Sequence, residues 1–310
     1  MKVSPRVLGT MVLLNVLWAP VNLAFKSALE EWSPSAIGFV RWTVFALLLA
    51  VLLQHAGFRK RVRAKVPTGG DAWQSLAIGA FLFAPAHFLY ILCQRYTTTL
   101  EATVLGTTGP FWVALLAFAM LGERVSSRRW LGIGAGCLGA YIVSLGWAWP
   151  TLSTQNALGN LMYLVAVLIE SVGFVLAVRV VLRSSGIGVL VYQAAGMGAA
   201  FLLASLLHPA LGMRFDGFSG STWVAMAYLT LVTSLICFSV WYAIAERVPL
   251  SVMVIMIGIQ APVSAFLGIT FLGETLRAEV VVGSLVVLGA ILVAATDRAA
   301  PLASSASDAP

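Results

Sequence analysis

The second half of the chain repeats the first. Pro110, an apolar run and Leu121-Gly122-Glu123 return as Pro262, a second apolar run and Leu272-Gly273-Glu274. A long hydrophobic chain with an internal repeat is typical of transporters that are built from two related halves. The repeat therefore favours a membrane protein with a substrate path between its halves.

The composition agrees with a membrane protein. Hydrophobic residues make up 60% of the chain and charged residues 10%, and the mean hydropathy is +0.94. An ordinary soluble domain has about 25% charged residues. The apolar residues form long runs between short charged loops, instead of alternating with polar residues as they do in a membrane barrel. The sequence therefore predicts an all-α integral membrane protein.

Runs of about 18 or more mostly apolar residues predict ten membrane-spanning helices. They lie at 6–27, 34–54, 72–94, 98–121, 128–147, 158–178, 187–207, 221–245, 249–272 and 277–296. Because five helices per half is an odd number, the second half enters the membrane in the opposite orientation to the first. We expect a first repeat at 1–147, a connecting loop at 148–157, a second, inverted repeat at 158–298 and a disordered cytoplasmic tail at 299–310.

The basic residues predict the orientation of these helices. The chain holds 19 Lys and Arg residues against 12 Asp and Glu residues, a net charge of +7. Most of the basic residues fall in loops that share one side of the membrane, while only Arg95, Arg214 and Arg277 fall in the opposite loops. Cytoplasmic loops carry such an excess of Lys and Arg. We therefore expect the inner (plasma) membrane, both termini in the cytoplasm and no nucleic-acid partner.

The sequence offers no pattern for a metal, a cofactor or an enzyme. Cys93, Cys137 and Cys237 lie in apolar runs without metal-ligand or disulfide spacing, so we expect them to be packing residues. The chain also has no HExxH, GxSxG or paired-acid catalytic motif. We therefore expect neither cofactor, metal nor catalytic residues.

Prolines mark predicted helix starts and breaks. Ser33 followed by Pro34 predicts an N-cap and a first-turn proline at the start of the second helix. Pro20, Pro110 and Pro262 interrupt predicted helices, where each removes a hydrogen bond and permits a kink. Because Pro110 and Pro262 fall in the fourth helix of each half, paired breaks there predict a midplane site or a hinge.

Arg41 lies about two turns into the second predicted helix, too deep for a loop residue. A charged side chain inside a span costs on the order of 2.5–3.5 kcal/mol on insertion scales, so it needs a partner. Its planar guanidinium suits an anionic group such as a substrate carboxylate. The alternatives are an ion pair with Glu30 or Glu31, or hydrogen bonds to carbonyl groups at a helix C-terminus.

Glu170 lies past the middle of the sixth predicted helix, where a lone carboxylate is costly. Its possible roles are to bind a substrate ammonium group, to relay a proton, or to pair with Arg41 across the two halves. His87 follows Pro85 in the third helix and belongs to the residue type that titrates near neutral pH. It is either a site residue or a neutral, hydrogen-bonded structural histidine.

Aromatic side chains are candidates for the wall of a cavity. Many Trp and Tyr residues sit at the membrane interface, but Trp18 and Trp112 lie farther from the predicted span ends than the others. We add Tyr90 as a third candidate. The candidate substrate-binding residues are then Arg41, Glu170, Trp18, Trp112, His87 and Tyr90.

Together these features resemble the ten-helix EamA-type exporters of the drug/metabolite transporter (DMT) superfamily. The resemblance covers nearly the whole chain and rests on Trp18, Lys26, Pro34, Arg41, Pro110 with Leu121-Gly122-Glu123, and the second-half counterparts of the last two. It implies inverted five-helix repeats around a central cavity and export of small metabolites by alternating access. Exporters of the YddG type, which favour aromatic amino acids, are the most similar group.

Two positions depart from the family pattern. Ala19 and Pro20 follow Trp18 where the family commonly has Trp-Gly, and Glu170 occupies a position that is usually uncharged. The first departure affects the shape of the first helix. The second affects the choice of substrate or coupling ion.

We therefore expect a secondary transporter that exports amino acids or related small metabolites. Arg41 is expected to attract a carboxylate, and Glu170 to meet an amine or a coupling proton, in a cavity walled by helices three, four, eight and nine. The expected partners are a small-molecule substrate, membrane lipids and, as a candidate coupling ion, protons. The alternatives are a multidrug exporter, a flippase for a lipid-linked substrate and a channel-like facilitator.

Overall fold

The computed structural model describes residues 4–61, 65–97, 102, 105–106, 108–122, 125–145, 156–248, 250–260, 262–263, 266 and 278–296. The predicted tail at 299–310 and nearly all of the predicted loop at 148–157 lie outside the described residues. The described elements are helices, with an isolated bridge between Trp32 and Phe215. The predicted all-α fold is confirmed.

The described elements follow the predicted spans in order. They are α1 (Pro5–Trp18), α2 (Val21–Leu29), α3 (Pro34–Gln54), α4 (Ala56–Arg61), α5 (Gly69–Ile78), η1 (Gly79–Phe83), α6 (Ala84–Cys93), α8 (Gly109–Leu121), α9 (Ser127–Leu145), α10 (Ala157–Val181), α11 (Gly186–Leu207), η3 (Pro209–Leu211), α12 (Gly220–Ala227), η4 (Tyr228–Phe238), α13 (Ser239–Ala245), α14 (Leu250–Ile255), η5 (Met256–Ile259) and α16 (Ala278–Thr296).

Among the residues that the structure describes, six helical segments are long and apolar enough to cross a membrane. They are Pro5–Leu29, Pro34–Gln54, Gly69–Cys93, Ala157–Val181, Gly186–Leu207 and Gly220–Ala245, and each coincides with a predicted span. The shorter helices α8, α9 and α16 lie on three further predicted spans, and α14 with η5 covers the start of the ninth. Helix boundaries differ from the predicted ones by up to about three residues where both ends are described.

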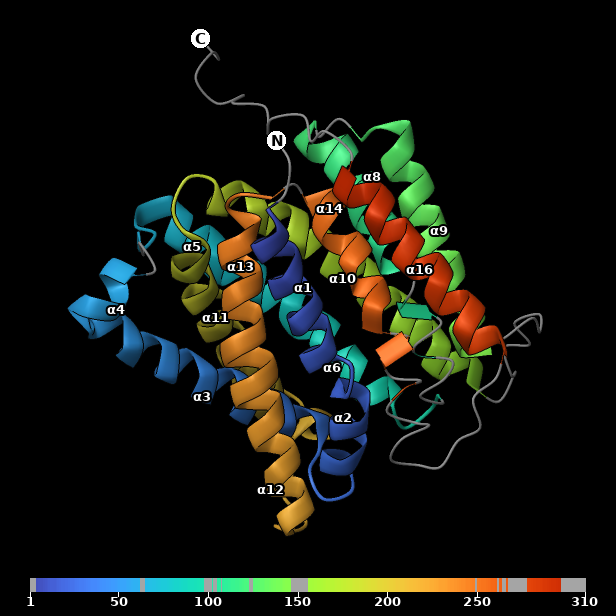
Figure 1. Ribbon diagram of the computed structural model, residues 1–310. Helices are drawn as coiled ribbons and strands as arrows, with labels where there is room; N and C mark the ends of the chain where they lie inside the picture. Colours follow the sequence, from blue (N-terminus) through green and yellow to red (C-terminus); the bar gives the residue numbers. More distant parts are fainter. Residues whose placement is uncertain are drawn as a thin grey trace.

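Helices in the same position of the two halves pack against each other. The second helices, α3 and α11, are in contact, as are α8 with α14 and α9 with α16; the last pair runs side by side along one edge of the molecule (Figure 1). Ser33 caps α3 and Ser185 caps α11, at the spacing that relates Pro110 to Pro262. The contacts thus follow the sequence repeat.

The third span of each half contains a π-helix, η1 in the first half and η4 in the second. Pro85 is the second residue after η1 and cannot donate to the carbonyl group four residues earlier, which disturbs the helix at this point. In η4 the hydroxyl groups of Thr233 and Ser234 both donate to the carbonyl oxygen of Leu229, at 2.6 and 2.9 Å. These side chains compete with the backbone for that acceptor. Local π-helix is frequent at functional sites.

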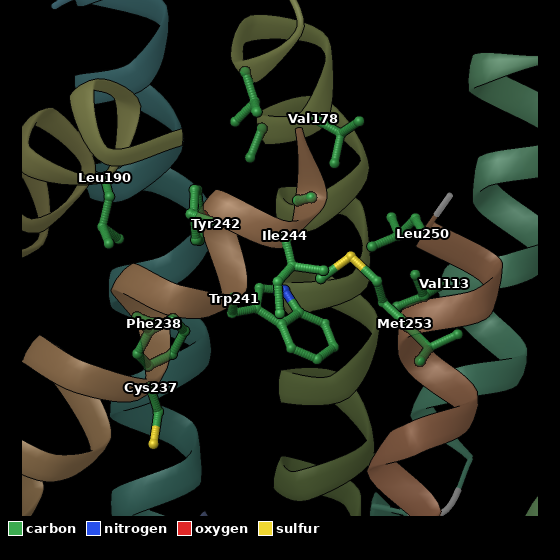
Figure 2. Packing of buried hydrophobic residues seen from close by; sticks show 14 of the residues in the cluster. Val113, Val178, Leu190, Cys237, Phe238, Trp241, Tyr242, Ile244, Leu250 and Met253 are labelled. Atoms are coloured by element: carbon green, nitrogen blue, oxygen red, sulfur yellow. The ribbon is translucent and has the colours of Figure 1, made fainter. Parts of the chain in front are cut away.

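A large cluster of buried apolar residues extends through both halves. Figure 2 shows part of it around α13, where Trp241 and Ile244 are directed toward Leu250 and Met253 of α14. Tyr242 lies on the other side of the same helix, toward α11 (Figure 2). Close van der Waals packing of this kind holds helices together in a bilayer, where apolar association has little driving force. This packing fixes α13, the end of the eighth span, between α11 and α14.

The turn between α2 and α3 contacts the segment between α11 and α12. The Ser33 hydroxyl accepts from the Ala36 N–H at 3.3 Å, as its predicted capping role requires, and donates to the Gly212 carbonyl at 3.2 Å. The rings of Trp32 and Phe215 meet edge-on with centroids 4.9 Å apart. These contacts join the two halves at one end of the molecule.

Glu31 belongs to the same contact. Hydrogen bonds from the Thr222 hydroxyl and from the Ser219 N–H, the latter at 2.8 Å, hold the pKa of the Glu31 carboxyl below its ordinary value. A lowered carboxyl pKa means that this contribution is present above the ordinary pKa and is lost as the pH falls through the lowered one. The contact is therefore strongest near neutral pH.

Mutation of Gly139 tests the packing of α9 against α16. A Cβ at Gly139 would lie 2.8 Å from the carbonyl oxygen of Gly283 and 2.9 Å from the Val287 side chain. We expect Gly139→Ala to push the two helices apart at a cost of about 1–3 kcal/mol, the usual range for overpacking. Gly134→Ala in the same helix is the matched control, because nothing lies within 4 Å of that position. Equal melting temperatures of the two variants in detergent would contradict the described packing.

Candidate functional site

A cavity of about 230 Å³ lies between the two halves of the chain. Its walls come from α1, α2, α3, α6, α8 and α9 of the first half and from α10, η4, α13, α14 and η5 of the second. These include the third, fourth, eighth and ninth helices, which were expected to form the wall. Five of the six predicted substrate-binding residues line it, namely Trp18, Arg41, His87, Tyr90 and Glu170.

Arg41 of α3 is 1% exposed and lines this cavity. Its Nε donates to Ser234 Oγ at 2.8 Å, and its Nη2 donates to Thr233 Oγ1 at 3.0 Å. The rings of Phe25 and Trp42 lie 5.4 and 4.8 Å from the guanidinium carbon, within cation–π range. Nη1 is buried and has no hydrogen-bond partner among the described residues. Its two N–H groups therefore remain for a further acceptor.

Thr233 and Ser234 serve Arg41 as acceptors. Each hydroxyl already donates its proton to the carbonyl of Leu229, so only lone pairs are left for the guanidinium. The π-helix η4 allows two consecutive residues to reach the same side chain. These neutral oxygens solvate the positive charge and leave it unneutralised.

The ion pairs considered for Arg41 from sequence are not formed. Neither Glu30, Glu31 nor Glu170 makes a salt bridge with it in the described part of the chain, where the recorded contacts pair His87 with Glu170 and Arg183 with Asp71. Glu31 is instead held by Ser219 at the end of the molecule. The alternative of helix C-terminal carbonyl groups is wrong as well, because the acceptors are two side-chain hydroxyls in the middle of a span.

Glu170 of α10 faces α6 of the first half. The Tyr90 hydroxyl donates to Glu170 Oε2 at 2.8 Å, and His87 Nε2 lies 3.5 Å from Oε1. The Glu170 side chain keeps 20% of its surface exposed, compared with 7% for His87. The carboxylate is therefore open to the cavity, while the histidine stands behind it. One cavity thus has a cationic wall from the first half and an anionic wall from the second.

Aromatic rings cover a further part of the wall. Trp18 meets Phe238 and Trp241 edge-on, with ring centroids 5.0 and 5.7 Å apart. Phe174 extends the group, 6.3 Å from Trp241. All four residues line the cavity. This surface suits an apolar or aromatic part of a ligand.

The other predicted site residues lie as follows. Trp112 does not line the cavity and packs beside the cluster that contains Cys93 and Tyr163. Pro110 lines the cavity from the first turn of α8, and Pro20 separates α1 from α2. Pro262 is described in helical conformation but is not a lining residue. A hinge function of the three prolines stays a prediction.

The sequence interpretation missed Thr233 and Ser234. The available indication was a pair of consecutive hydroxyl residues inside an apolar span, yet such residues often bond only to their own helix. Gln260 also lines the cavity, and its Nε2 donates to Asn15 Oδ1 at 2.9 Å, from the ninth helix to the first. Within the described ranges, no three His, Cys, Asp or Glu residues are grouped to hold a metal ion.

Comparison with known proteins matches each half of the chain separately. The model of the EamA-like transporter family matches residues 6–145 and again residues 157–296. The uncharacterized transporter YetK of Bacillus subtilis is 26% identical over 69% of this chain and 66% of that protein. A probable terminal-alkyne amino-acid exporter of Streptantibioticus cattleyicolor is 26% identical over 88% of both chains. A crystal structure with 18% identity shares the fold, with a TM-score of 0.74 over 94% of this chain and 97% of that one.

Mutation of Ser234 tests whether its hydrogen bond with Arg41 stabilises the protein. In Ser234→Ala the Nε–H of a buried guanidinium loses its acceptor, which is expected to cost about 1–3 kcal/mol. Ser239→Ala is the matched control in the next turns of the same span, because the buried Ser239 Oγ has no described partner to lose. We expect the melting temperature in detergent to fall for Ser234→Ala and to stay unchanged for Ser239→Ala. Equal values for both variants would show that the bond does not support Arg41.

Proposed function

The chain belongs to the EamA-like transporter family, and from that premise we propose that it exports amino acids or closely related small metabolites as a secondary transporter. The substrate binds between Arg41 and Glu170. The two repeats then expose this site alternately to the two sides of the membrane.

Membership of the family establishes the general class of the protein. The protein is a membrane transporter and not an enzyme, since the family and the similar proteins are named as transporters. One family match in each half, together with five helices per half, makes the fold a pair of inverted repeats around the central cavity. We assign it to the inner (plasma) membrane with both termini in the cytoplasm, on the distribution of its basic residues.

The observation that carries the proposal is the presence of two opposite charges on one cavity. Arg41 Nη1 offers donors that no described residue accepts, and a guanidinium pairs well with a carboxylate. Glu170 is partly exposed to the same cavity, and among the described residues its recorded contacts are the Tyr90 hydroxyl and His87 Nε2, the latter 3.5 Å away. An amino-acid zwitterion supplies a carboxylate for Arg41 and an ammonium group for Glu170, so that both charges of the cavity are neutralised together.

The size and surface of the cavity support a small substrate. Pockets for drug-sized ligands enclose roughly 300–1,000 Å³, whereas this cavity encloses about 230 Å³. The ring group of Trp18, Phe174, Phe238 and Trp241 offers an apolar surface for a side chain. The similar protein from Streptantibioticus cattleyicolor, named as a probable amino-acid exporter, favours the same substrate class.

The contacts of both charged residues suggest how transport and binding are coupled. Arg41 of α3 is held by η4, and Glu170 of α10 is held by α6, so each charge depends on a contact between the halves. When one repeat rocks against the other, both sets of contacts change. Substrate affinity then differs between the two access states, which a ligand needs in order to shift their populations.

The alternatives make different demands on the site. A multidrug exporter or a flippase for a lipid-linked substrate accommodates larger ligands and has no need of both charges. A channel-like facilitator conducts without counterflow. Thermal stabilisation by amino acids but not by drugs or lipid precursors, together with counterflow in vesicles, would separate the proposed exporter from these.

Transport by site variants tests the proposal. We expect Arg41→Ala and Glu170→Gln each to lower amino-acid counterflow at least tenfold, because each removes one of the charges that the zwitterion meets. Counterflow of radiolabelled amino acid in proteoliposomes is the measurement, normalised to the amount of folded protein. Full activity of both variants would remove the proposed site.

Asp71→Asn is the matched control for Glu170→Gln. It makes the same carboxylate-to-amide change in an exposed ion pair with Arg183, at 2.9 Å and away from the cavity. Exposed ion pairs contribute about 0–1 kcal/mol to stability, so this variant is expected to transport normally. Arg41→Lys serves as a second variant if Arg41→Ala does not fold, since it keeps the charge and loses the planar fork.

A further inference from the structure

A second, much smaller pocket lies behind His87, on the side away from the large cavity. It encloses about 10 Å³ and is lined in part by Trp42, His87, Gln193, Phe238 and Tyr242. His87 and Phe238 line both pockets and so form the partition between them. The small pocket joins α3 and α6 of the first half to α11, η4 and α13 of the second.

Three polar groups around this pocket have no described partner. They are Trp42 Nε1, Gln193 Nε2 and His87 Nδ1; the other ring nitrogen of His87, Nε2, also has no hydrogen bond but lies toward Glu170. Their residues are 2%, 1% and 6% exposed, so bulk water does not reach them. A buried polar group without a partner typically costs about 1–3 kcal/mol. Three such groups around one small space indicate that something polar satisfies them together.

We propose that one ordered water molecule occupies this pocket and binds Trp42, Gln193 and His87. A single water needs roughly 10–15 Å³ of probe-occupied space and two to four polar partners, and the pocket supplies about 10 Å³ and three.

The donors around the water fix its orientation. Trp42 Nε1 is a donor only. The Tyr242 hydroxyl donates to Gln193 Oε1, so that the amide turns its NH₂ group toward the pocket. The water thus accepts two hydrogen bonds and has only protons left for His87. Nδ1 of His87 must then be the acceptor.

This orientation determines the form of His87 and the role of the water. A histidine that accepts at Nδ1 is neutral and carries its proton on Nε2, the nitrogen that lies 3.5 Å from Glu170 Oε1. An imidazolium would bring a third donor to a water with two lone pairs. The Nε2–H of His87 then faces Glu170 Oε1 from 3.5 Å, beside the hydrogen bond that the Tyr90 hydroxyl donates to Oε2, and both contacts favour a Glu170 that acts as an acceptor. Trp42 and Gln193 act as positioning residues for the ammonium-binding carboxylate; this role, unlike the water site itself, rests on the proposed function.

The protonation of His87 can be measured directly. The chain has three histidines, and the other two, His55 and His208, are exposed. With both replaced by Gln, the ¹⁵N spectrum of histidine-labelled protein reports His87 alone, without any substrate. We expect the neutral Nε2–H tautomer. An Nδ1–H tautomer or an imidazolium at pH 7.5 would overturn the proposal.

Two variants and one control connect the tautomer to the water. Gln193→Leu removes the amide, and Trp42→Phe removes the indole N–H while keeping a ring beside Arg41; each is expected to convert the single His87 tautomer into a mixture. Met197→Leu changes an apolar wall residue of the same pocket and is expected to leave the spectrum unchanged. A tautomer that persists in both Gln193→Leu and Trp42→Phe contradicts the water site.

The water site and the proposed function can be tested independently of each other. Loss of the Nε2–H tautomer in the polar variants supports the water even if no amino acid is transported. A wrong tautomer removes the water, while a requirement for Glu170 in counterflow would leave the proposed function standing.

Discussion

The guanidinium of Arg41 lies buried among membrane-spanning helices, and no described carboxylate neutralises it. Removing an ion from water is costly, and the cost is recovered only by well-placed partners. Thr233 and Ser234 supply lone pairs and Trp42 supplies a ring face. These partners require the π-helix of η4 and the close contact between α3 and η4. These partners leave the donors of Nη1 without an acceptor and the positive charge without a counter-ion among the described residues. An anionic ligand would supply both.

The repeat supplies a nearly symmetric scaffold, whereas the charges break its symmetry. At the spacing that relates the two helix caps, the counterpart of Arg41 is Gln193 and the counterpart of Glu170 is Trp18. Each charge therefore occurs in one half only, with an uncharged residue at the matching position. A cavity with one cationic and one anionic side orients a ligand that has opposite charges at its two ends. In the proposed mechanism, duplication supplies the two repeats that rock against each other, and divergence at these positions supplies the charges that select the substrate.

Much of the fold could be predicted from sequence because membrane spans are governed by local rules. Length, apolar composition and basic loops identify helices one by one, and the cost of burial alone marked Arg41 and Glu170. The partners of these residues come from helices far away in the chain, and distance along a helix does not reveal which face meets which neighbour. For that reason Thr233 and Ser234 were missed, Trp112 was named as a wall residue although it does not line the cavity, and three plausible ion pairs of Arg41 were wrong.

The central claim is that a single ligand satisfies both charges at once, and the ligand itself tests this most directly. Binding of phenylalanine to the purified protein can be compared with that of phenylalaninamide, which lacks the carboxylate, and of N-acetylphenylalanine, which lacks the ammonium group. All three carry the same ring. We expect measurable affinity for phenylalanine and at least tenfold weaker binding of both analogues. Equal affinity for the three compounds would contradict a site built on Arg41 and Glu170.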